Sequence, residues 1–151
     1  MEQENISLII DFDDTLVDVN AAKVILENYD KEFYSEKSNL YKKKLHSLPI
    51  KWQKILNYNY SSYHLFVIRF DLSKIKLNYK KIFQKFRSRN FFVNLHYMPL
   101  HLSPFFKKRG FRQGQFPEAE KYAASSISIP IFVDLQEKKI NEICNLIKSF
   151  F

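Results

Sequence analysis

The chain has 151 residues and a formal net charge of +8 at pH 7; 46% of its residues are hydrophobic, 17% are aromatic and 26% are charged. This length allows one domain with a modest hydrophobic core, and the apolar fraction excludes a disordered chain. The single cysteine excludes a disulfide framework and is typical of a reducing compartment. No apolar run is long enough to span a bilayer, and the acidic amino terminus does not resemble a signal peptide. We therefore expect a cytoplasmic protein without a membrane segment.

The positive charge is distributed along the chain rather than concentrated in one block. Lysines occur across residues 31–54, 74–85 and 107–108. A nucleic-acid site usually gathers Lys and Arg on one face, so this distribution favours solvated surfaces over nucleic-acid binding. A phosphate-bearing ligand is a second use for some of the lysines, and a basic, non-enzymatic binding module remains an alternative.

A short β-branched run at residues 6–10 leads into the sequence DFDDT. A strand that delivers D-x-D-x-T at its carboxyl end resembles the first motif of the haloacid-dehalogenase phosphatases. That resemblance implies Asp11 as nucleophile, Asp13 as general acid and base, and Mg²⁺ held by the two carboxylates. The family also needs a later Ser or Thr, a Lys and a downstream acidic pair that helps to hold the metal. Two aspartates farther along the chain, Asp71 and Asp134, have no acidic residue within two positions. The alternative interpretation is therefore a strand-to-helix turn with Asp14 or Thr15 as N-cap.

A long helix is predicted for residues 18–45, because apolar side chains recur there at helical spacing with charged residues between them. Pro49 ends it, and residues 51–62 form a polar connector. Residues 63–70, with the sequence YHLFVIRF, are the clearest strand and are apolar enough to be central in a sheet. His64 at its start is either a strand-end histidine held by a hydrogen bond or a ligand contact.

The next helix is predicted for residues 75–89, after Asp71 as N-cap. Its apolar face lies opposite Lys and Arg, so we expect it to cover the sheet. Residues 91–97 form the second strand, which Pro99 ends because proline cannot donate a ladder hydrogen bond.

Residues 116 to about 125 are predicted to form a helix with proline and an acidic residue in its first turn. The third strand covers residues 127–133, where Pro130 favours an edge or bulge position. A closing helix covers residues 135–150 after Asp134 as cap. Its apolar face consists of Ile140, Ile143, Cys144 and Ile147, so Cys144 is expected to be a buried, inert thiol.

From residue 63 onward the predicted order is β-α-β-loop-α-β-α. This order indicates an α/β (α+β) fold with a small three-stranded sheet that helices cover on one side. A strand and a long helix precede this unit.

The stretch from residue 95 to residue 132 contains H-Y-x-P-x-H-x-x-P-aromatic-aromatic, then Gly, then F-P-x-A-E, then S-x-P-hydrophobic-F. This order resembles the C-terminal small domain of the DegT-type sugar aminotransferases. Those proteins are pyridoxal-phosphate (PLP) enzymes of the aspartate-aminotransferase fold, and they aminate keto-sugars carried on nucleotides. The most similar branch makes 4-amino-4,6-dideoxy sugars, including the precursor of pseudaminic acid. The matching positions are His96, Tyr97, Pro99, His101, Pro104, Phe105, Phe106, Gly110, Phe116, Pro117, Ala119, Glu120, Ser128, Pro130 and Phe132.

In that family the H-Y-x-P-x-H loop lies over the active site and helps to hold the sugar nucleotide. The resemblance therefore implies that His96, Tyr97 and His101 contact the sugar or the diphosphate. Basic residues just downstream, Lys107, Lys108 and Arg109, are the expected phosphate partners. The alternative for His96 and Tyr97 is that they pack the loop against the sheet. No metal site is expected, since the two histidines have no Cys, Asp or Glu near them in the sequence.

PLP chemistry needs a Schiff-base lysine, an acidic partner for the pyridine nitrogen and a grip on the phosphate. The family places these groups in a large domain upstream of the small one. The resemblance thus predicts a haloacid-dehalogenase-like strand and turn at residues 1–25 and an aminotransferase-like small domain at residues 26–151. We expect a truncated or fused fragment that neither binds PLP nor transaminates alone. A large domain or a second copy of the chain is its expected partner, and whether the chain is itself an enzyme stays open.

Overall fold

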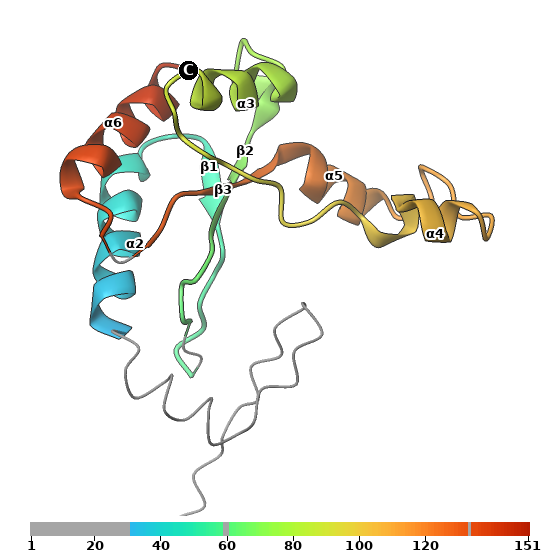
Figure 1. Cartoon of the computed structure of the whole chain (residues 1–151), viewed down its shortest axis with the longest axis horizontal. Coiled ribbons are helices and arrows are strands. Elements are labelled where there is room, and N and C mark those ends of the chain that lie inside the picture. The colour runs from blue at the N-terminus through green and yellow to red at the C-terminus, as the bar shows by residue number, and fades with distance from the viewer. Residues whose placement is uncertain (1–30, 59–60, 133) are drawn as a thin grey trace, which may run out of the picture. The chain divides into compact units, whose positions relative to one another are not determined.

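The fold is given by a computed structural model that describes residues 31–58, 61–132 and 134–151 (Figure 1). The haloacid-dehalogenase-like motif, with Asp11 and Asp13, lies outside these residues. The first part of the predicted long helix and the strand before it also lie outside them. Within the described ranges, no helix combines the length and the apolar character that a bilayer crossing needs.

A three-stranded antiparallel sheet in the order β1-β2-β3 lies at the centre. Its strands are β1 (Ile50–Trp52), β2 (Phe66–Phe70) and β3 (Ser126–Ile129). Side chains alternate between the two faces of a strand, so Phe66, Ile68 and Phe70 of β2 are buried and the residues between them are only partly buried. Ile68 pairs with Trp52 on one side and with Ile127 on the other. The predicted fold class and the central position of β2 are confirmed.

The sheet is not built from the three segments that the sequence predicts. Strand β1 begins at Ile50 and continues into the stretch predicted as a polar connector, because three strand residues are too few to show a period. Residues 91–97, predicted as a strand, form only one bridge, between Asn94 and Ser128. Phe91 is instead tied to the end of the preceding helix, because its amide donates to the Phe86 carbonyl at 3.0 Å. The prediction of a full strand here was therefore wrong.

Strand β3 ends at Ile129, directly before Pro130, and it lies at the edge of the sheet. The edge position that Pro130 predicts is confirmed. The strand is shorter than predicted, because proline has no amide hydrogen with which to continue the ladder.

Helix α2 (Lys31–Leu45) packs against helix α6 (Glu137–Lys148), and helix α3 (Tyr79–Arg87) completes the helical cover (Figure 1). Cys144 of α6 is 1% exposed, and burial raises its pKa to about 11. A thiol with so high a pKa carries little nucleophilic thiolate at neutral pH, which supports the prediction of an inert cysteine. The predicted apolar face of α6 is buried throughout: Ile140, Ile143, Cys144 and Ile147.

Two predicted helix starts were wrong by a few residues. Asp71 caps a single 3-10 turn, Leu72–Lys74, by accepting a hydrogen bond from the Ser73 amide, and α3 begins later with Asn78 as its N-cap. Helix α6 begins at Glu137, so Asp134 is not its cap. Helix α5 (Pro117–Ser125) is found where it was predicted, with Phe116 as its N-cap instead of its first residue.

Tyr41 fixes α2 to the chain that follows β3. Its hydroxyl donates to the Pro130 carbonyl at 2.9 Å, and its ring stacks on Phe66 with centroids 5.5 Å apart. The side chain is fully buried, and this burial raises the pKa of the phenol. The backbone beyond β3 therefore has a defined position although it belongs to no strand.

Residues 99–125 form a segment that we call the arm. It contains a 3-10 turn (Leu100–Leu102), helix α4 (Pro104–Lys107) and helix α5, and Figure 1 shows α5 leading from α4 back to the sheet. Gly110 has φ +92° and donates to the Lys107 carbonyl at 3.1 Å, which is the left-handed ending that glycine permits after a helix. Phenylalanine rings in edge and stacked contacts line the arm: Phe105, Phe106, Phe111 and Phe116.

One carboxylate, that of Glu120, ties the arm together. Its Oε1 accepts from His101 Nε2 at 2.8 Å and from the Gly114 amide at 2.7 Å. His101 is 6% exposed, and its ring lies 4.7 Å from that of Phe116. The hydrogen bond from His101 is the main cause that holds the pKa of Glu120 below its ordinary value, and the backbone hydrogen bonds act in the same direction.

We predict that Glu120→Gln lowers the melting temperature at neutral pH and makes it less dependent on pH in the acid range. A carboxyl whose pKa is depressed by folding stabilises the protein above its unfolded pKa, about 4.3, and loses that contribution as the pH falls through the folded pKa. Thermal unfolding followed by circular dichroism from pH 7 to pH 3 should show the two curves converging at the acid end.

The matched control is Glu118→Gln, in the same helix. Glu118 bonds to Lys121 at 2.7 Å, but its side chain is 83% exposed, and exposed ion pairs contribute little to stability. Equal effects of the two substitutions would contradict the role given to Glu120.

Candidate functional site

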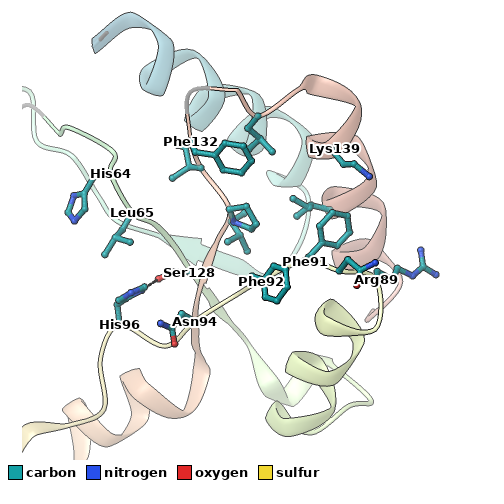
Figure 2. A pocket seen from close by; sticks show the side chains of 16 residues that line it. His64, Leu65, Arg89, Phe91, Phe92, Asn94, His96, Ser128, Phe132 and Lys139 are labelled. Carbon is teal, nitrogen blue, oxygen red and sulfur yellow. Dashed lines mark hydrogen bonds between the residues drawn. The ribbon is translucent and has the colours of Figure 1, made fainter. Parts of the chain in front are cut away.

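A cavity of about 630 Å³ opens beside the edge strand β3 (Figure 2). Four segments that are far apart in the sequence form it: the residues just before β2, the stretch from the end of α3 to His96, β3 with the chain after it, and the first turns of α6. Its lining is mostly apolar, with polar groups at one end and cationic groups at the other. The lining residues are His64, Leu65, Arg89, Asn90, Phe91, Phe92, Asn94, His96, Ser128, Ile129, Pro130, Ile131, Phe132, Leu135, Lys139 and Ile143.

Ser128 organises the polar end. Its amide donates to the Asn94 carbonyl at 2.8 Å, and the Asn94 amide donates to the Ser128 carbonyl at 3.3 Å. Its hydroxyl shares a 2.7 Å hydrogen bond with His96 Nδ1. Figure 2 shows this bond, with His64 close by. The imidazole of His96, two residues after the Asn94–Ser128 bridge, is thus held against the sheet.

The surroundings of His96 favour its neutral form. Burial of the ring is the main cause that lowers its pKa, and the neighbouring His64 adds to the effect. A neutral imidazole has one donor and one acceptor nitrogen, and Ser128 engages only Nδ1. The other nitrogen is therefore suited to a hydroxyl or carbonyl group of a ligand.

Aromatic and cationic side chains form the rest of the cavity. Phe91 is buried, whereas Phe92 is 84% exposed and Phe132 is 49% exposed. Lys139 lies with its ammonium 5.9 Å from the centroid of the Phe91 ring and donates to Glu142 Oε2 at 2.8 Å. Arg89 is the second cation at this end.

The binding residues expected from the sequence lie in three different places. His96 is in the cavity, and Tyr97 is next to it, 59% exposed, with its ring 4.8 Å from the imidazole. His101 lies inside the arm on Glu120, away from the cavity lining. The expected phosphate partners lie at the end of α4 and directly after it, where all three are exposed.

Lys107 and Lys108 are both exposed at the end of α4. Arg109 packs its guanidinium over the Phe105 ring at 3.5 Å and donates to the Phe105 carbonyl at 3.4 Å. These contacts hold Arg109 in place by a cation–π interaction and leave the lysines free to meet a solvated anion.

Sequence analysis named two of the other cavity residues: Ser128 as part of the S-x-P signature, and His64 as a possible ligand contact at the start of a predicted strand. Arg89, Phe92 and Lys139 carried no recognisable signal, because they meet only after the chain folds.

The described residues gather no group of metal ligands, and the lining of the cavity does not fit PLP. Within residues 31–58, 61–132 and 134–151 no three His, Cys, Asp or Glu side chains come together in a way that would hold a metal ion. Lys139 is the lysine of the cavity lining, and it is bound to Glu142. No carboxylate of the described residues lines the cavity to hold a pyridine nitrogen protonated, so PLP does not fit the cavity.

Comparison with known proteins matches residues 26–148 to the DegT/DnrJ/EryC1/StrS aminotransferase family. An uncharacterised protein of Methanocaldococcus jannaschii is 30% identical over 89 residues, which are 58% of this chain and 23% of that protein. A pleiotropic regulatory protein of Geobacillus stearothermophilus is 41% identical over 54 residues, 36% of this chain and 14% of that protein.

Solved structures with the same fold include a putative sugar aminotransferase from Streptococcus pneumoniae, with a TM-score of 0.74 and 20% identity over 86% of this chain and 33% of that one. Helicobacter pylori PseC, an aminotransferase involved in the biosynthesis of pseudoaminic acid, gives a TM-score of 0.71 and 20% identity over 85% of this chain and 35% of that one. The chain thus spans about a third of the length of these solved proteins and 23% of the first curated relative. Because the family match covers most of the sequence, this chain belongs to the DegT/DnrJ/EryC1/StrS aminotransferase family.

Proposed function

We propose that residues 26–151 act as the C-terminal small domain of an aminotransferase for nucleotide-linked 4-keto-6-deoxy sugars, and that they form the wall that faces the sugar nucleotide. The observation that carries the proposal is the H-Y-x-P segment held to the edge of the sheet by Ser128. The family match and the likeness to sugar aminotransferases of known structure support it. A role in making a pseudaminic-acid precursor is the finer proposal, and the likeness to Helicobacter pylori PseC supports it.

Different residues take different parts of such a ligand. His96 is neutral and offers a ring nitrogen to a sugar hydroxyl, while the exposed Tyr97 hydroxyl offers a second contact. Lys107, Lys108 and Arg109 would meet the diphosphate, since ammonium and guanidinium groups bind phosphate by charge-assisted hydrogen bonds. His101 acts indirectly, because its bond to Glu120 sets the position of the arm that carries these cations.

PLP chemistry belongs to residues other than those described. When bound in this family, PLP supplies the electron sink for amino transfer. The described residues supply substrate contacts instead, so amino transfer requires a large domain that carries the PLP groups. The chain at residues 31–151 would then orient the sugar and shield it from water.

A binding titration tests the role of His96. We predict that the chain binds a UDP-linked N-acetylhexosamine, and that His96→Ala weakens this binding about tenfold, the size expected for one well-placed hydrogen bond to a ligand. Two-dimensional ¹H–¹⁵N NMR of the full chain measures both the affinity and the residues that shift.

The matched control for that titration is His46→Ala. His46 is exposed after the end of α2, where its Nδ1 bonds to the Lys43 carbonyl at 2.8 Å. This variant should bind like the parent chain. Absence of saturable binding, or equal loss in both variants, would contradict the proposed substrate wall.

A second measurement tests the proposal that this chain contacts the substrate but does not bind PLP by itself. We predict that equimolar PLP at micromolar concentration adds no absorbance band at about 410–430 nm when it is mixed with the chain. The reason is that the cavity lining, which includes Lys139, contains no Asp or Glu to hold the pyridine nitrogen protonated. A stoichiometric band that disappears in a single Lys→Ala variant would show that the chain holds PLP by itself.

A further inference from the structure

We propose that helix α3 docks the protein on the surface of an anionic phospholipid bilayer. The contact is made by the charged side chains that this helix exposes to solvent, which we call the basic face: Lys80, Lys81, Lys85 and Arg87. The inference goes beyond the proposed function, because none of these four residues lines the cavity beside β3 or belongs to the arm.

The exposed surface of α3 carries positive charge alone. The positions that the helix exposes are the four residues of the basic face and Gln84. The neighbouring sequence adds no negative charge, since residues 72–117 contain eleven Lys and Arg and no Asp or Glu. Lys76 before the helix and Arg89 after it are also exposed, and no ion pair within the described part of the chain involves any of these six cations. This surface is therefore complementary to a polyanion.

Two other helices neutralise their exposed lysines, whereas α3 does not. In α5 Lys121 bonds to Glu118 at 2.7 Å, and in α6 Lys139 bonds to Glu142 at 2.8 Å. Lys81 of α3 instead lies four residues before Lys85, a spacing at which two like charges destabilise a helix. Solubility does not require this repulsion, because mixed charges provide solubility in α5 and α6. A bound polyanion would relieve the repulsion.

The fold presents the basic face in a fixed orientation. Asn78 caps α3, because its side chain accepts a hydrogen bond from the Lys81 amide at 2.9 Å. Ile82 and Phe86 are fully buried beneath the helix, and the Phe86 ring meets that of Phe150 with centroids 5.6 Å apart. The backbone of α3 is thus already ordered before it meets a partner, so docking loses little backbone entropy.

The composition of the basic face favours a lipid surface over a nucleic acid. Single-stranded nucleic acids are usually bound in a groove with aromatic rings on which the bases stack. The basic face contains no aromatic residue and lines no part of the cavity. Anionic headgroups form a plane of charge that needs neither feature, and clusters of about four to eight Lys and Arg on a helix are attracted to it. Since the face also contains no apolar side chain, it adsorbs to the headgroups and does not insert between the acyl chains.

Cosedimentation of the full chain with lipid vesicles tests the proposal. Vesicles of phosphatidylcholine with about 30% phosphatidylglycerol should bind the chain, and vesicles of phosphatidylcholine alone should not. Raising the NaCl concentration from about 0.1 M to about 1 M should release the bound chain, because the Debye length falls from about 10 Å to about 3 Å.

A triple substitution in α3 locates the contact. Lys80→Gln, Lys81→Gln and Lys85→Gln together should weaken vesicle binding about a hundredfold, since each lysine near an anionic surface strengthens binding roughly fivefold. The melting temperature of this variant should not fall, because the substitutions remove the repulsion between Lys81 and Lys85. A weaker interaction with vesicles would then not be the result of unfolding.

A second triple variant is the matched control. Lys43→Gln, Lys51→Gln and Lys54→Gln replace three other exposed lysines and lower the net charge by the same amount. This variant should bind the vesicles within about threefold of the parent chain, because these lysines lie outside α3.

Three results would overturn the proposal. One is the absence of binding to the phosphatidylglycerol vesicles, and another is an equal loss in the two triple variants, which would reflect net charge alone. The third is binding to an RNA strand or a DNA duplex that is tighter than binding to the vesicles and that the α3 substitutions weaken, which would make nucleic acid the partner. The α3 variant should bind the UDP-linked sugar like the parent chain, so this proposal and the proposed function fail separately.

Discussion

The candidate site depends on one pair of backbone hydrogen bonds, between Asn94 and Ser128. These two bonds attach a segment with no other ladder bonds to the edge of a three-stranded sheet. The same serine then holds His96 through its side chain, so one residue sets both the path of the loop and the direction of the imidazole. Without it the H-Y-x-P segment would have no fixed relation to the sheet.

The position of Ser128 is in turn fixed from both sides. Strand β3 is buried along its whole length, and its Ile127 pairs with Ile68 of the central strand. Just beyond the strand, the Tyr41 hydroxyl of α2 holds the Pro130 carbonyl. The wall of the cavity that β3 forms is therefore part of the folded core, and the loop that contains His96 is attached to it.

The sequence predicts those parts of the structure that have a local cause. Helix α5 could be placed from its proline and acidic first turn, and the buried face of α6 from its spacing. Strand β1 could not, since three residues carry no period. Residues 91–97 have the alternation of a strand, with Phe91 and Val93 buried, but the sheet edge offers them a partner only at Asn94.

The site shows the same division. His96 could be selected from its motif, and the family resemblance brought Ser128 into view. The bond between His101 and Glu120 links residues nineteen apart and is invisible to periodicity, so the two histidines of the motif seemed to share a role that the structure divides between cavity and arm. Arg89 and Phe92 line the cavity only because the fold brings them together with residues of β3 and α6.

Amide hydrogen exchange at Asn94 and Ser128 is the most direct test of this account. If the two hydrogen bonds between these residues anchor the loop, both amides should be protected from exchange as strongly as the amides of β2 and β3. The amide of Tyr97 should exchange as fast as the amides of an unstructured loop. An Asn94 amide that exchanges as quickly as that of Tyr97 would show that the loop is not held to the sheet, and the candidate site would lose its basis.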